Sequence, residues 1–157
     1  MIRPVFLDTT VFFDSIDDDR MKTIMDHAKN AGFTLKTSIT VIGEALTQMR
    51  ENRDKDRYVP AFLDLLDAWD INIHYPNDPV RVLCYIMGDE EIDSRIIREV
   101  TDRTHLAYAM AYHSEFFITS DKNMRSYRVP KKLEDVGFIK PITLSLQDFR
   151  DEILNKR

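Results

Sequence analysis

Short apolar runs alternate along the chain with longer segments of helical periodicity. The runs predict strands at 3–7, 34–37, 71–75, 115–119 and 141–144. The segments between them place apolar residues three and four positions apart, the spacing of a helix with one buried face. This alternation is typical of βαβ units, so we expect an α/β domain whose central parallel sheet has about five strands.

Several helix boundaries are marked by capping residues. Ser38 predicts the start of a helix with Glu44 off its apolar stripe, and Asp78-Pro79 reads as an N-cap followed by proline at the first helical position. Helical spacing in 92–100 continues toward Asp102, whereas 122–137 has little periodicity and reads as a surface loop or lid. The stripe after Ser38 consists of Ile39, Ile42, Leu46 and Met49.

Four acidic residues fall where a predicted strand ends or a predicted helix has just begun. Asp8 and Asp121 each close an apolar run, whereas Glu44 and Asp102 lie near the starts of helical segments. Ligands of parallel α/β sheets bind at the carboxyl ends of the strands, and carboxylates gathered there repel one another unless a cation neutralises them. Oxygen ligands suit Mg²⁺ or Mn²⁺. These four residues are therefore the catalytic and metal-binding candidates.

Each candidate has a structural alternative. An aspartate after a buried strand is often a turn former, and an acid at the start of a helix often complements the helix dipole. We assign Asp14, Asp93 and Asp135 to such caps or to solvated faces. His105 reads as a packed or hydrogen-bonded helix residue.

Length and composition describe an ordinary globular chain. The 157 residues suit one domain, 1–157, with 43% hydrophobic and 31% charged residues. No apolar run approaches the ~20 residues of a membrane helix, and the first residues lack the layout of a secretory signal. The single cysteine, Cys84, forms no internal disulfide and has no zinc-site spacing to the histidines. We expect a cytoplasmic protein with no membrane segment.

The net charge of −5 argues against a surface that binds nucleic acid everywhere, because phosphate contacts depend on lysine and arginine. Two local strips are basic. The first strip comprises Arg50, Arg53, Lys55 and Arg57. The second strip follows Asp121 directly and comprises Lys122, Arg125, Arg128, Lys131 and Lys132. The second strip is the predicted substrate-binding surface, and a merely solvated loop is its alternative.

Three motifs carry a family resemblance: Asp8-Thr9-Thr10, Asp102-x-x-His105-Leu106-Ala107-x-Ala109 and Thr119-x-Asp121, with Glu44 between the first two. They occur in the order found in PIN domains, so the chain resembles a PIN-domain ribonuclease from about Ile2 to its C-terminus. Two positions depart from the family pattern. Thr10 stands where Asn or Ser is frequent, and Asn123 stands where a further Asp is common, which weakens one metal site.

The resemblance implies a single three-layer α/β/α domain with strand order 3-2-1-4-5, in which Asp8 and Asp121 face each other. It implies a Mg²⁺- or Mn²⁺-dependent endoribonuclease that cleaves single-stranded RNA with metal-activated water. Thr10 and Thr119 are then expected to support the ligands, and Arg103 to contact phosphate. The chain is also similar to toxin nucleases of toxin-antitoxin pairs, which implies a homodimer held inactive by an antitoxin protein.

Three other functions stay open. A PIN nuclease of RNA processing would carry the same four acids. A catalytically silent PIN-like interaction module is compatible with Asn123. A phosphatase with an aspartate nucleophile is disfavoured, because it requires a second aspartate where Thr10 stands.

Overall fold

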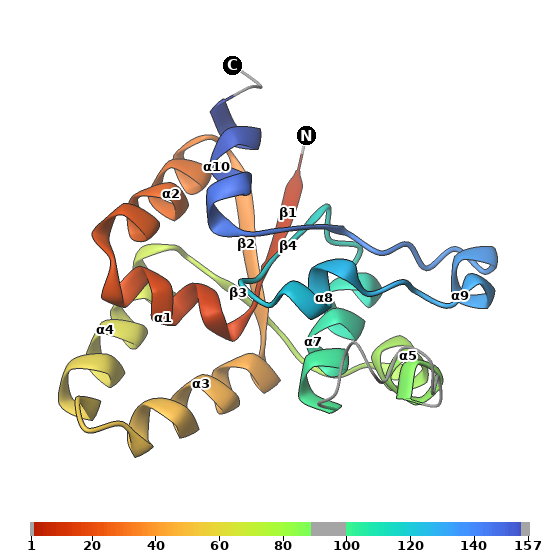
Figure 1. The fold of residues 1–157 in the computed structure, drawn as a ribbon, viewed down its shortest axis with the longest axis horizontal. Helices are drawn as coiled ribbons and strands as arrows, with labels where there is room; N and C mark the ends of the chain where they lie inside the picture. Colours follow the sequence, from red (N-terminus) through yellow and green to blue (C-terminus); the bar gives the residue numbers. More distant parts are fainter. Residues whose placement is uncertain (1, 89–99, 155–157) are drawn as a thin grey trace.

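The computed structural model describes residues 2–88 and 100–154 (Figure 1). At its centre is a five-stranded sheet in which all neighbouring strands are parallel, in the order β3-β2-β1-β4-β5. The predicted α/β class and strand order are confirmed. The strands are β1 (Arg3–Leu7), β2 (Phe33–Ser38), β3 (Asn72–His74), β4 (Phe116–Ile118) and β5 (Ile142–Leu144).

Helices cover both faces of the sheet, which gives the three layers (Figure 1). One face carries α1 (Thr9–Asp17), α2 (Asp19–Asn30), α4 (Lys55–Ala68) and α10 (Leu146–Leu154). The other carries α5 (Asp78–Gly88) and α7 (Val100–Ala111), and α3 (Ile39–Glu51) lies at the carboxyl end of the sheet. Two short helices, α8 (Lys122–Ser126) and α9 (Lys131–Asp135), lead to β5. Within the described residues, every helix is too short or too polar to cross a membrane.

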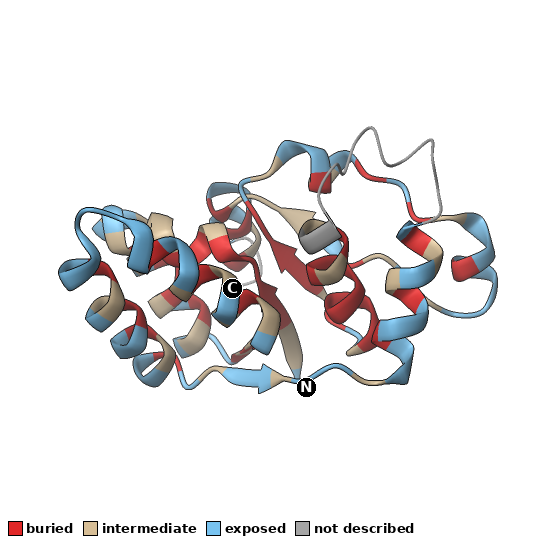
Figure 2. Ribbon diagram, turned by 90° about the horizontal axis from the view of Figure 1, so that it is seen from below, coloured by how far each residue is buried: buried red, intermediate tan, exposed pale blue. Residues whose placement is uncertain are grey.

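The two central strands are buried on both sides, as Figure 2 shows. Val5, Phe6 and Leu7 of β1 have no exposed surface, and neither has any residue of β4. This is the burial expected of a parallel sheet covered by helices, and it explains why these strands are continuous apolar runs in the sequence. The close-packed centre fixes the backbone of Asp8 and Thr119, the residues that directly follow the two strands.

The helix caps agree with the sequence in one case and differ by a residue in another. Ser38 Oγ accepts a hydrogen bond from the N–H of Val41 at 3.1 Å, so α3 begins where predicted. In α5 the capping side chain is Asn77 rather than Asp78, since its Oδ1 accepts from the N–H of Val80 at 2.9 Å. Asp78 and Pro79 then lie inside the first turn, where a missing N–H costs nothing.

Two expectations need correction, and one helix was not foreseen. The buried side chains of α3 are Val41, Ala45 and Met49, whereas Ile39 of the predicted stripe is 38% exposed. The segment after Asp121 forms the helices α8 and α9 rather than an irregular loop, and α1 starts directly after Asp8 without having been predicted. Most of the helical pattern at 92–100 lies outside the described residues.

Candidate active site

Asp8 is buried at the end of β1, with 4% of its surface exposed. Its backbone N–H donates to the carbonyl of Ile118 at 3.1 Å, which ties the residue to β4. Asp8 occupies the N-cap position of α1, yet its side chain caps no helical N–H. Instead its Oδ2 accepts from Thr119 Oγ1 at 2.7 Å, with Thr10 Oγ1 3.5 Å away. The carboxylate is therefore not used as a helix cap.

Thr119 connects Asp8 to the turn that carries Asp121. While its hydroxyl donates to Asp8, its oxygen accepts the backbone N–H of Asp121 at 3.1 Å. Thr10 Oγ1 accepts the N–H of the residue after Thr119, also at 3.1 Å. Asp121 caps α8, because its Oδ1 accepts from the N–H of Asn123 at 2.8 Å. Thr10 and Thr119 thus fasten the end of β1 to the turn after β4.

Glu44 reaches the same place from α3 and is held by three donors. Thr9 Oγ1 donates to its Oε2 at 3.1 Å, and Gln48 Nε2 donates to its Oε1 at 3.1 Å. His105 on α7 makes the third contact, because its Nε2 donates to Glu44 Oε2. The same imidazole nitrogen lies 3.9 Å from Asp8 Oδ1. His105 therefore sits between two of the predicted acids, and it is fully buried.

The four predicted acids line one pocket of about 240 Å³. Asp102 reaches it from the first turn of α7, and a fifth acid, Asp14 of α1, lines it as well. The sequence, which assigned Asp14 to a cap or a solvated face, did not place it at this site. None of the nine described lining residues is basic. Carboxylates from three helices and two strand ends are thus collected around one cavity without a cationic side chain in its wall.

The pKa values of Asp8 and Glu44, the two acids nearest His105, are shifted in opposite directions. Burial raises the pKa of Asp8, the charge of Glu44 raises it further, and His105 and the Thr119 hydroxyl act in the other direction. The pKa of Glu44 is lowered, chiefly because His105 hydrogen-bonds the carboxylate. A buried carboxylate with a raised pKa next to further acids is the electrostatic situation that a bound cation would relieve.

The donor set fits a hard divalent cation, because the acids and nearby hydroxyls offer only oxygen. Among the described residues, no three His, Cys, Asp or Glu side chains are already arranged to hold a metal ion. Glu44, Asp102 and Asp121 line the pocket and are only partly buried. Asp8 and Glu44 would be the fixed members of the set. Asp8 is held by β1, β4 and Thr119, and Glu44 is held by its three hydrogen-bond donors.

The predicted substrate-binding residues are not in the pocket wall. Arg103 is buried in α7 and donates from Nη1 to the carbonyl of Gly88 at 3.2 Å. Lys122 and Arg125 lie on α8, next to Asp121, whereas Arg128 and Lys131 lie further along the connection to β5. The structure brings this strip to the side of the site rather than into it.

The interpretation of His105 as a packed or hydrogen-bonded helix residue is confirmed, but the sequence did not identify Glu44 as its partner. Gln48 follows Glu44 by one helical turn, and this spacing places it on the same face of the helix, where it hydrogen-bonds the carboxylate. Thr9 and Asp14 carry no such signal, because α1 itself was not predicted.

The strand order, the helix layers and the pocket at the carboxyl end of the sheet define a PIN-like α/β/α domain. Solved structures that share this fold include the following three. A chain of VapBC2 from Rickettsia felis, bound to a promoter DNA fragment, superposes with a TM-score of 0.67 at 14% identity, covering 92% of this chain and 98% of that one. VapBC-1 from nontypeable Haemophilus influenzae superposes with a TM-score of 0.60 at 13% identity, covering 94% of this chain and 99% of that one. VapC20 of Mycobacterium tuberculosis, a toxin that cleaves the sarcin-ricin loop, superposes with a TM-score of 0.52 at 16% identity, covering 86% of this chain and 96% of that one.

The resemblance to PIN domains is thereby confirmed at the level of the fold. No protein-family model matches the sequence, and no curated protein is similar enough to match it. Identities of 16% and below carry no residue-level assignment, so the role of each acid in this chain rests on its own geometry.

Proposed function

We propose that this protein is a metal-dependent endoribonuclease that cleaves single-stranded RNA. The observation that carries the proposal is the convergence of Asp8, Glu44, Asp102 and Asp121 on one pocket at the carboxyl end of a PIN-like sheet. These residues are separated by up to 113 positions in the sequence, from 8 to 121, and reach the pocket from separate elements. Their mutual repulsion favours a function that requires negative charge in that place.

Mg²⁺ or Mn²⁺ bound to these acids would lower the pKa of water and offset charge on the leaving oxygen of a phosphodiester. The side chains of the protein would orient the carboxylates that hold the ion. Asp8 is oriented by Thr119, and Glu44 by Thr9, Gln48 and His105, so both carboxylates present fixed oxygens to the pocket. Such support typically changes metal affinity or activity by about 10- to 100-fold when it is removed.

The biological role we propose is that of a toxin nuclease. The solved structures with this fold include toxin–antitoxin complexes and a toxin that cleaves the sarcin-ricin loop. An antitoxin protein that inhibits the nuclease, a homodimeric assembly and a cytoplasmic location follow as parts of the same proposal. An RNA-processing nuclease is the alternative with the same site.

A cleavage assay with single-stranded RNA and Mg²⁺ or Mn²⁺ tests the activity. Asp8→Asn and Asp102→Asn are expected to abolish cleavage, whereas Asp135→Asn, at an exposed position of α9, is expected to leave it unchanged. Equal activity of all three variants would contradict a role for the pocket.

A silent interaction module has one specific observation in its favour. The acids are engaged within the chain, since Asp121 caps α8 through Asn123 and Glu44 already accepts three hydrogen bonds. Mn²⁺ binding measured without RNA, followed by the cleavage assay, separates the two functions. Metal binding without cleavage would favour the module.

A further inference from the structure

Phe13 is the single apolar side chain among the nine described residues that line the acidic pocket. It lies on α1 beside Phe12, and the two rings have different surroundings. Phe12 is fully buried, with its ring 5.0 Å from that of Phe62 and 6.1 Å from that of Trp69. Phe13 is only partly buried. Phe12 thus belongs to the core, whereas Phe13 packs against the edge of the core and lines the pocket.

The ring of Phe13 is supported from behind. Its centroid lies 5.5 Å from that of Tyr58 on α4, at an interplanar angle of 54°. The Tyr58 hydroxyl donates to Asp17 at 2.6 Å, and the guanidinium of Arg57 lies 4.4 Å from the centre of the tyrosine ring. Arg57 also pairs with Asp17 at 3.3 Å. Phe13 is therefore backed by a hydrogen-bonded aromatic residue rather than by a loose surface.

The same contacts lead from the pocket to the first basic strip, which runs from the end of α3 to the start of α4 and which we call the α3–α4 strip. It comprises Arg50, Arg53, Lys55 and Arg57. α1, α3 and α4 pack against one another at this end of the sheet (Figure 1). Phe13 contacts Tyr58, and Tyr58 lies beneath Arg57. Arg50 is exposed in the last turn of α3, and Arg53 is exposed on the turn that precedes α4. An aromatic face at the pocket is thus followed outward by basic side chains.

We propose that Phe13 is the platform on which a base next to the scissile phosphate stacks. This inference rests on the proposed ribonuclease function and specifies how the substrate is held. Phosphates of a single strand can be positioned by charge alone, but an aromatic face in an otherwise polar pocket suits the π-face of an unstacked base. The strand then leaves the pocket over Phe13 toward the α3–α4 strip.

Binding to two short probes tests the platform. One is an oligoadenylate and the other an abasic ribose-phosphate chain of the same length, both titrated by fluorescence anisotropy with Ca²⁺ in place of Mg²⁺ and checked for integrity afterwards. Phe13→Ala and Phe13→Leu are expected to weaken oligoadenylate binding about tenfold, the size of a 1.4 kcal/mol change and within the range of one base–aromatic stack. Both variants should bind the abasic chain like wild type, and Phe13→Trp should retain oligoadenylate binding.

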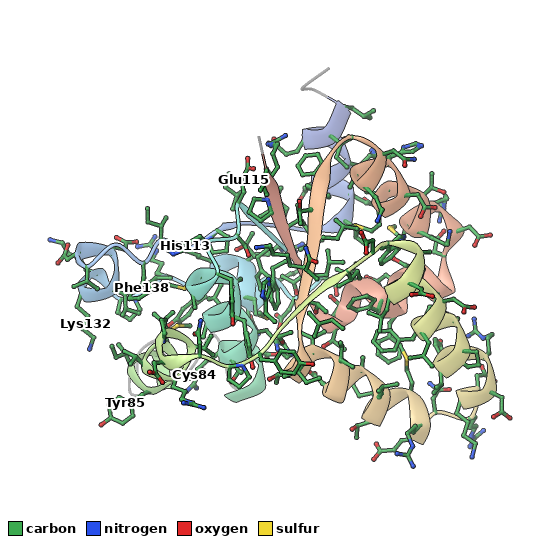
Figure 3. The ribbon with its side chains drawn as sticks, turned by 180° about the vertical axis from the view of Figure 1, so that it is seen from behind. Cys84, Tyr85, His113, Glu115, Lys132 and Phe138 are labelled. Atoms are coloured by element: carbon green, nitrogen blue, oxygen red, sulfur yellow. The ribbon has the colours of Figure 1, made fainter. Side chains whose placement is uncertain are left out.

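Leucine separates stacking from space-filling, because it keeps much of the apolar volume without a ring. Phe138 provides the matched control, since it is also partly buried and lies beyond α9 (Figure 3). Phe138→Leu should leave both affinities unchanged, and thermal melting of all variants reports any loss of folding.

Two results would overturn the stacking platform and leave the nuclease function intact. One is wild-type affinity of Phe13→Leu for oligoadenylate, and the other is an equal loss of affinity for both probes. The first would leave the ring as packing or as a contact for a protein partner. A wild-type protein that binds neither probe and cleaves no RNA would overturn the nuclease function together with the platform.

Discussion

His105 on α7 hydrogen-bonds the carboxylate of Glu44 on α3, across 61 positions of sequence. The imidazole is fully buried, and its Nδ1 has no hydrogen-bond partner among the described residues. The ring therefore contributes one polar contact to the fold, and that contact is with a candidate metal ligand. Because α3 lies at the carboxyl end of the sheet and α7 covers one of its faces, this hydrogen bond sets the position of Glu44 relative to Asp8.

Substitutions of His105 are expected to show that it positions Glu44. The amide of Gln can reach where Nε2 lies, whereas the shorter Asn cannot, so His105→Gln should stay close to wild type in Mn²⁺ affinity. His105→Asn should bind Mn²⁺ about 10- to 100-fold more weakly, the usual cost of losing an outer-shell partner. Calorimetric Mn²⁺ titration without RNA measures this directly. The same loss in both variants, together with a lower melting temperature, would make the histidine a packing residue only.

Asp8→Asn is expected to abolish cleavage while the metal-free protein becomes equally or more stable near neutral pH. The pKa of Asp8 is raised by burial, so the folded state holds the proton more tightly than the unfolded state. Stability from this group is present below the ordinary aspartate pKa of about 3.9 and is lost as the pH rises through the folded value. Asparagine carries no charge and can still accept from Thr119.

Urea unfolding of the metal-free proteins at about pH 3.5 and pH 7 measures the effect. The advantage of Asp8→Asn should be present at the higher pH and small at the lower one. Asp8→Ala is the control, because it removes both the charge and the acceptor for Thr119. A large destabilisation of Asp8→Asn at neutral pH would identify Asp8 as a structural turn residue.

Chelation is expected to stop the enzyme reversibly. An oxygen-only pocket should lose activity in EDTA and regain it with Mg²⁺ or Mn²⁺, whereas Zn²⁺ prefers nitrogen and sulfur ligands that the pocket does not offer. Cleavage is measured before chelation, in EDTA and after each ion is added back. Activity that survives exhaustive chelation would refute the metal mechanism, provided that Asp8→Asn is inactive under the same conditions.

The sequence was most informative for strands whose two faces are both buried, because such strands must be apolar throughout. β1 and β4 are buried on both faces, and the same burial makes them unbroken apolar runs, which is why their ends and the acids that follow could be located. Asp8 and Asp121 were therefore assigned from position alone. The strand order was obtained only through the family resemblance, because periodicity does not record which strands pair.

Contacts made by polar residues on helices were harder to foresee. Nothing in the sequence around His105 identifies Glu44 as its partner, since that contact depends on how α3 and α7 cross the end of the sheet. Helix α1 was missed because Thr9 and Thr10 are weak helix formers, and with it Phe13 and Asp14 were lost from the site. The two short helices after Asp121 are similarly too brief to show a periodic pattern.

The two basic strips lie on separate parts of the fold, one at the junction of α3 and α4 and the other along α8 and α9 (Figure 1). Neutralising Arg125, Arg128 and Lys131 together is expected to weaken binding of single-stranded RNA and to flatten its salt dependence. Each lost phosphate contact should reduce the slope of log affinity against log salt by about 0.7. Metal binding should not change, because none of these side chains lines the pocket.

Neutralising Arg50, Arg53 and Lys55 provides a matched variant, since it removes the same charge from the protein and leaves Arg57 in its pair with Asp17. A strand that crosses the pocket and leaves over Phe13 should touch both strips, so both variants should show a reduced slope. A purely general effect of net charge would lower both affinities equally and leave both slopes at the wild-type value. If the variant without Arg125, Arg128 and Lys131 keeps the wild-type slope while the other variant does not, the RNA path runs over the α3–α4 strip alone. The second strip would then be a solvated surface.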